Sequence, residues 1–311
     1  MNKPITLYVS DNDLIKWTGE DGKLHCIQIR QDDSGEDSPR NWDNLTIMAC
    51  FHRRYRLGDN LGDSLREDRG EKYSPDAYLL RLVRKTLSDE ALAAAFKAGK
   101  CPRVTIFPSD QDPSRYDICL KEDGELLVGE VEEKELGHEL DYILDDIVET
   151  RDCLALLSDY MEYLPLWLYD HSGITMSCGT RTYPYNDEWD SGQVGWIFAM
   201  KSTLIKEGVA TEENWREVAK KTMEYDVKVY DYFLTNQVYG YTLYEAARPE
   251  NPDEKPNWEE TDSCWAFYGD DIMENGIADA VDIRDVIKDG AYTTGTAKEV
   301  HTISYEFEFA S

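Results

Sequence analysis

The chain has 311 residues, of which 41% are hydrophobic and 12% aromatic, and its 63 acidic against 33 basic residues give a formal net charge of −30. This length can bury a large core without disulfide or metal staples, and the aromatic content excludes a disordered acidic tail. The charge disfavours direct contact with nucleic acid or an anionic membrane. An acidic surface can nevertheless occupy a basic groove that would otherwise hold a nucleic acid.

Cysteine usage indicates a reducing compartment. The seven cysteines are scattered and contain no C-x-x-C pair, which is typical of buried thiols in a cytosolic protein. The N-terminus contains no apolar stretch resembling a signal peptide, and no run approaches the ~18–20 apolar residues of a membrane span. We expect a soluble protein of the cytoplasm, with no cofactor indicated.

The N-terminal third mixes strand and helix patterns. Apolar and alternating runs predict strands at 4–10, 14–18, 24–30 and 45–51, with a turn at 20–23. Residues 56–73 form a glycine-rich, charged segment that predicts a loop. Helices are predicted from the N-cap Ser74 and from the N-cap Ser88, the second ending at Gly99.

An acidic segment follows. Residues 103–107 and 116–133 read as strands with a hairpin turn, and the spacing of apolar residues predicts one helix over 136–164. Residues 117–162 contain sixteen acids and three bases. This density exceeds what solubility needs, although a solvated helix face is the simpler interpretation. The candidate partner-binding residues are those on the polar face: Glu139, Asp141, Asp145, Asp146, Glu149 and Asp152.

The stretch Leu166–Met200 is the expected folding centre. Its two apolar runs, at 166–169 and 194–200, are rich in Trp and Tyr and each adjoins a short polar, glycine-containing segment. This pattern predicts two buried strands joined by one elaborate loop.

The C-terminal part again interleaves the two patterns. A long amphipathic helix is predicted over 211–237 and a short one near 280–287, with strands at 238–245, 263–268 and 299–309 and a loop at 248–262. The whole pattern indicates an α+β fold, with a mixed or mostly antiparallel sheet and several amphipathic helices packed on it. We expect an N-terminal α+β region at 1–110 and a central and C-terminal region at 111–311, with one continuous domain as the alternative.

Asp170, His171, Ser172, Cys178 and Asp190 form the strongest catalytic candidate. A histidine beside a carboxylate can serve as general base for Ser172 or Cys178. No G-x-S-x-G elbow surrounds these residues, and neighbours along a strand point to opposite faces. The alternative is that Asp170 and Ser172 stabilise a tight turn through bonds to the backbone.

Metal and nuclease chemistry have weaker support. His52, His171, Cys178 and Asp190 lack the ligand spacing of a zinc or calcium site, so no metal is predicted. Asp117 with 132–134 loosely matches a D…(D/E)-x-K nuclease pattern, but the surrounding negative charge would repel a phosphodiester. No phosphate-binding glycine motif is present, and the basic run at 52–56 is expected to pair with carboxylates.

Several stretches carry a resemblance to a family of uncharacterised proteins that recur in bacteriophages and other bacterial mobile elements. The matching stretches are 41–45 (NWDNL), 51–55 (FHRRY), 169–173 (YDHSG), 189–195 (WDSGQVG) and 238–241 (VYGY). The family has no activity or catalytic residues that could be transferred to this chain. The resemblance implies a phage setting, in which acidic accessory proteins often bind and block host defence proteins.

Two functions from different classes follow. The first is a phage-encoded, non-enzymatic inhibitor in the host cytoplasm that binds a basic or nucleic-acid-handling defence complex through acidic surfaces, including mimicry of nucleic acid. The alternative is a hydrolase that uses His171 and Asp190, with Ser172 or Cys178 as nucleophile. Homo-oligomerisation is left open.

Overall fold

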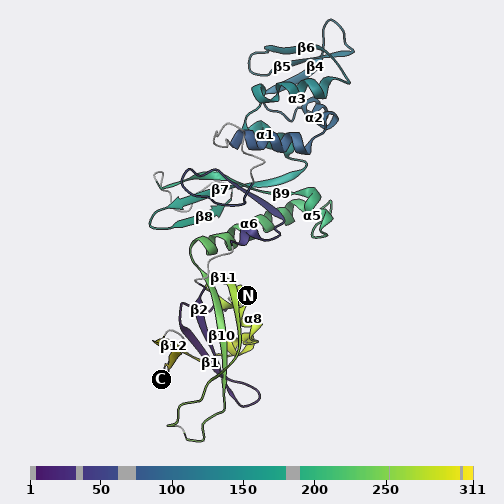
Figure 1. Ribbon diagram of the computed structural model, residues 1–311. Helices are drawn as coiled ribbons and strands as arrows, with labels where there is room; N and C mark the ends of the chain where they lie inside the picture. The colour runs from purple at the N-terminus through teal and green to yellow at the C-terminus, as the bar shows by residue number, and fades with distance from the viewer. Residues whose placement is uncertain are drawn as a thin grey trace. The chain divides into compact units, whose positions relative to one another are not determined.

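The computed structural model describes residues 5–32, 38–61, 75–179, 190–251, 253–301 and 304–310 (Figure 1). The chain divides into two units, each built from more than one stretch. The first unit comprises Met1–Trp42, Tyr169–Met176 and Val227–Ser311, and the second comprises Asp43–Leu168 and Ser177–Asp226. The boundary expected near residue 110 therefore lies inside the second unit.

The first unit is built on a six-stranded antiparallel sheet. Its spatial order is β11 (Glu259–Tyr268), β10 (Val238–Ala246), β2 (Leu24–Gln31), β1 (Asp13–Thr18), β12 (Tyr292–His301) and β13 (Ser304–Phe309). Apolar side chains from one sheet face, including Ile15, Ile27 and Tyr241, form a core with three short helices on that side (Figure 1). The helices are α7 (Ile272–Asn275), α8 (Ile277–Ala280) and α9 (Arg284–Lys288).

The other face of this sheet carries aromatic side chains. Tyr244 on β10 contacts Phe307 on β13, with ring centroids 5.0 Å apart, although three strands separate β10 from β13 in the sheet order. The sheet must therefore curl strongly, as twisted antiparallel sheets do. Trp258, which precedes β11, also contacts Phe307 and Phe309 and covers part of this face.

The core of the second unit lies among helices. Four helices bury one stripe each against a shared cluster that includes Leu79, Phe96, Leu140 and Leu156. A three-stranded antiparallel sheet lies beside the helices α2 and α3 (Figure 1). The helices are α1 (Pro75–Thr86), α2 (Asp89–Lys97), α3 (Leu136–Ile147) and α4 (Thr150–Leu157), and the strands are β4 (Val104–Pro108), β5 (Arg115–Leu120) and β6 (Leu126–Glu132).

A four-stranded sheet contains the predicted folding centre. Its order is β3 (Thr46–Cys50), β9 (Ser191–Met200), β7 (Met161–Asp170) and β8 (Ile174–Cys178). Strand β9 is buried along 194–199, because the run VGWIFA carries no charge and packs on both faces. Two helices complete the described elements, α5 (Lys201–Lys206) and α6 (Trp215–Leu234), together with a short 3-10 turn, η1 (Pro39–Asn41).

The α+β class and the predominance of antiparallel pairing are confirmed. The single helix predicted over 136–164 is wrong. Glu149 and Asp152 form a reciprocal capping box that begins α4, so the helix breaks at Val148, which is extended. The residues from Met161 onward belong to β7.

Other predicted elements differ at their ends. Residues 5–10 form only an isolated bridge between Tyr8 and Asp271 instead of a strand. The strand predicted at 299–309 is a hairpin, β12–β13, and part of the loop predicted at 248–262 belongs to β11. The N-cap Ser74 and most of the loop at 56–73 lie outside the described residues. Within the described part of the chain, no helix combines the length and apolar character needed to cross a membrane.

Replacing Gly195 with alanine should disrupt the pairing of β3 with β9. A Cβ on Gly195 would lie 1.9 Å from the carbonyl oxygen of Ala49, a backbone atom that cannot move without opening the strand pair. We expect Gly195→Ala to lower the free energy of unfolding by about 2–4 kcal/mol. Urea denaturation measures this change. Gly192→Ala, where a Cβ meets nothing within 4 Å, is the control and should change stability little. Equal effects of the two substitutions would contradict the argument.

Asp231 should make the protein less stable at neutral than at acidic pH. The backbone N–H of Met176 donates to its Oδ1 over 2.7 Å, yet burial raises the pKa of this carboxyl. A raised folded-state pKa means that the folded chain holds the proton to higher pH, so this group's stability contribution falls as pH rises from the ordinary Asp value through the raised one. Its place in the last turn of α6 adds to the cost of the charge.

Asp231→Asn should therefore raise stability near pH 7, on the order of 1 kcal/mol. The advantage should shrink towards pH 4, where the native carboxyl is itself protonated. Thermal unfolding of both proteins across this pH range checks the expectation. A variant that is less stable than the native protein at every pH would show that the charged hydrogen bond outweighs burial.

Candidate functional site

Two of the six predicted partner-binding acids hold α3 against α1. Arg84 on α1 donates from Nε to Asp141, 2.9 Å away, and from Nη2 to Asp145, 2.8 Å away. All three side chains are partly exposed, so the arrangement contributes modestly to stability. Their charges are largely neutralised within the chain, which leaves less to offer a partner.

Two further acids act at the start of α4. Glu149 pairs with Arg103 over 2.6 Å, and its side chain takes part in the capping box. Asp152 is buried and accepts the backbone N–H of Glu149 at 3.0 Å. Asp152 therefore stabilises the helix terminus and does not belong to an exposed binding face. Its i+3 spacing from Glu149 was the sequence signal for this role.

The remaining two acids lie on one face of α3, where Glu139 is half-buried and Asp146 is exposed. Residues at i, i+4, i+7 and i+11 share one helix face, and this spacing aligns Glu135, Glu139, Tyr142 and Asp146, which we call the α3 stripe. Within the described chain, Glu139 and Asp146 form no ion pair, and Glu135 has only Lys134, 3.9 Å away. Tyr142 is 78% exposed. Sequence reasoning did not single out Tyr142, although its helical spacing from the acids was visible.

The predicted catalytic residues occupy a β-hairpin. His171 and Ser172 are exposed in the turn between β7 and β8, where the backbone N–H of His171 donates to the carbonyl oxygen of Gly173 at 3.1 Å. Ser172 has a left-handed backbone with φ of 60°, as tight turns require. An exposed turn gives neither residue the water-excluded surroundings that catalysis by these groups normally uses.

Cys178 and Asp190 lie at the ends of two strands of the four-stranded sheet. Cys178 is the last residue of β8, and Asp190 immediately precedes β9. Burial, together with the charge of Glu224, raises the pKa of the Cys178 thiol to about 11. A thiol with so high a pKa is protonated at neutral pH and is a poor nucleophile.

The residues of the predicted metal and nuclease patterns do not form a site. Among the described residues, no group of three potential metal ligands comes together. Asp117 accepts the backbone N–H of Glu130 at 2.9 Å, Glu132 pairs with Arg115, and Glu133 pairs with Lys97. The Nδ1 atom of His52, in the basic run, accepts the backbone N–H of Tyr55 at 3.3 Å. These side chains are engaged in local structure.

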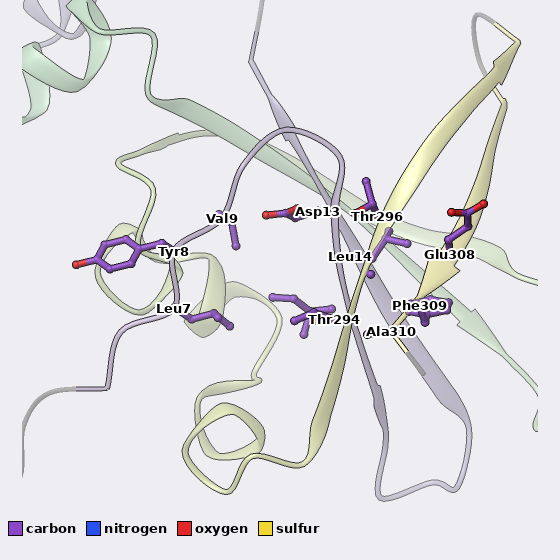
Figure 2. A pocket seen from close by; sticks show the side chains of 12 residues that line it. Leu7, Tyr8, Val9, Asp13, Leu14, Thr294, Thr296, Glu308, Phe309 and Ala310 are labelled. Atoms are coloured by element: carbon purple, nitrogen blue, oxygen red, sulfur yellow. The ribbon is translucent and has the colours of Figure 1, made fainter.

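A hollow of about 540 Å³ lies in the first unit, between the N-terminal segment and strands β1, β12 and β13 (Figure 2). Its carboxylates are already engaged: Asp13 accepts from the Ser10 backbone at 2.7 Å, and Glu308 pairs with Lys298 at 2.7 Å. The lining contains no histidine or cysteine. The hollow therefore offers no nucleophile paired with a base.

No family model, curated protein or solved structure matches this chain. The structure itself defines an α+β protein whose most distinctive exposed feature in the second unit is the α3 stripe, an acidic helix face with a central tyrosine.

Thiol labelling checks the state of Cys178. Iodoacetamide reacts with thiolates, so at pH 8 we expect the native protein to be alkylated at the exposed Cys264 well before the partly buried Cys178. Peptide mass spectrometry over time gives both rates. The Cys178 rate should climb as the pH approaches 11, and labelling of Cys178 as fast as Cys264 at pH 8 would show an activated thiol instead.

Proposed function

We propose that the protein is a non-enzymatic binding protein that docks a basic partner protein through the α3 stripe. The observation that supports this most directly is the position of Tyr142, 78% exposed, in line with Glu135, Glu139 and Asp146 on one helix face. Exposed tyrosines serve as anchors in protein interfaces, and surrounding carboxylates speed encounter with a basic surface.

The internal ion pairs support this choice of surface. Arg84 and Arg103 neutralise the acids beside the stripe, whereas the stripe keeps its own charge apart from the long contact of Glu135 with Lys134. The uncompensated charge is therefore localised next to an aromatic side chain. A partner that complements it carries lysine or arginine around an apolar recess that admits a tyrosine ring.

The biological setting is part of the proposal. The resemblance of several stretches to bacteriophage and mobile-element proteins favours a role against a bacterial host, as an inhibitor of a defence complex in the host cytoplasm. Such complexes handle nucleic acid through basic grooves, and a rigid acidic helix can occupy a groove of that kind. The protein would then act by occlusion, with no chemical step.

Affinity purification from bacterial lysate at low salt, followed by mass spectrometry, tests this function. The variant Glu139→Lys/Tyr142→Ala/Asp146→Lys should recover the basic partner about tenfold to a hundredfold less well than the native chain. Capture by the native chain should weaken as salt rises, because screening acts on exposed charges. None of the three substitutions touches the buried core, so unfolding measurements should show a stable variant.

A charge-matched control separates the stripe from net charge. Glu20→Lys/Glu254→Lys makes the same change in charge at two exposed sites in the first unit. It should bind the partner as the native chain does. Loss of binding in this control as large as in the stripe variant would contradict a localised interface, and the absence of any stoichiometric partner at low salt would end the proposal.

A further inference from the structure

Arg30 is the arginine of the described chain whose side chain contains a buried nitrogen without a hydrogen-bond partner. It forms no ion pair with any described residue, and its only hydrogen bond there runs from Nη2 to the hydroxyl of Thr242, 3.2 Å away. Its Nε is buried and has no hydrogen-bond partner among the described residues. By contrast, carboxylates pair with Arg84, Arg103, Arg115, Arg216 and Arg284.

Two aromatic rings flank the Arg30 guanidinium. Its central carbon lies 4.8 Å from the ring centroid of Trp265 on β11 and 5.8 Å from that of Tyr305 on β13. These are the two edge strands of the six-stranded sheet, and the curl of the sheet brings both towards β2. Cation–π contacts hold the faces of a guanidinium but leave its in-plane N–H groups available.

Gly240 leaves the space that the Trp265 indole needs to lie beside Arg30. It lies directly opposite Arg30 in the register of β10 with β2. A Cβ at this position would lie 2.2 Å from the indole of Trp265, so only glycine lets the indole lie against the β10 backbone beside Arg30. The VYGY stretch singled out in the sequence therefore has a structural reason.

A second cation lies on the same face of the sheet. Lys16, one strand further along on the same sheet face, lies 3.9 Å from the ring centroid of Phe309 and likewise forms no ion pair with a described residue. Burial raises the pKa of Tyr244; Glu260 adds to this rise, and Arg30 opposes it. Glu260 forms no ion pair with Arg30.

We propose that Arg30, between Trp265 and Tyr305, binds an oxyanion, either a carboxylate or a phosphate group of a ligand. An oxyanion can accept from the N–H groups of Nη1 and Nη2 in parallel, whereas the buried Nε is shielded from solvent. Trp265 is 39% exposed, so the site opens to solvent on the side of β11. The site is separate from the α3 stripe and does not depend on the function proposed for it.

Nuclear magnetic resonance of the full chain tests this site with two probes, inorganic phosphate and acetate, at ionic strength held constant with sodium chloride. The arginine Nε–H resonance that disappears in Arg30→Lys identifies Arg30. With one of the probes, or both, this resonance should shift in a saturable way, and the probe that saturates at lower concentration identifies the class of oxyanion. If neither probe gives a saturable shift, the proposal is wrong.

Variants separate binding from folding. Arg30→Lys keeps the charge but removes the planar fork, so it should bind about tenfold more weakly, as judged by backbone resonances of β2 and β10. Trp265→Leu should weaken binding about threefold while keeping the Arg30 signal. The matched control Arg248→Lys, at an exposed unpaired arginine of the same unit, should bind as the native chain does. If Arg30→Lys does not fold, the Trp265→Leu result decides, and unchanged affinity in the folded variants overturns the proposal.

Discussion

Carboxylates outnumber basic groups by 63 to 33 in this chain, and that imbalance governs how its charged side chains are arranged. Nearly every cation can find an acid, so pairing is the expected state of a base and isolation is the expected state of many acids. The pairs of Arg84 with Asp141 and Asp145 and of Arg103 with Glu149 neutralise much of the surface around α3 and α4. The informative positions are therefore the acids beside an exposed aromatic side chain and the cation held between aromatic rings instead of carboxylates.

Element types were accessible from the sequence where one physical signal dominated. The hairpin β1–β2, the N-cap Ser88 and the buried strand β9 follow from turn chemistry and apolar patterning. The failure over 136–164 came from competing signals. Leucines at helical spacing continue into 154–164, while the capping pair Glu149 and Asp152 ends one helix and starts another. Periodicity alone does not report such a break.

The candidate site was predictable only in part. Spacing in the sequence shows which residues share a helix face, but it does not show which residues of other helices form ion pairs with them. Glu139 and Asp146 could be assigned to the polar face of one helix from spacing alone. That Asp141 and Asp145 meet Arg84, which lies more than fifty residues earlier, depends on how α1 packs against α3. For the same reason His171, Ser172 and Cys178 are close in sequence, whereas His171 and Ser172 lie in an exposed turn and Cys178 is the partly buried end of β8.

The roles of two glycines and of Arg30 also depend on contacts between segments that are far apart in the sequence. Gly195 and Gly240 are both required by close approaches, to the Ala49 carbonyl and to the Trp265 indole, that join segments far apart in the chain. The sequence marks them only as members of short runs, WDSGQVG and VYGY. The six-stranded sheet curls, so that Trp265 on β11 and Tyr305 on β13 both lie against Arg30 on β2. Gly240 leaves room for the Trp265 indole in this arrangement. A guanidinium held there by rings instead of carboxylates is a property of the folded sheet, and in a chain of net charge −30 it marks where an anion can be received.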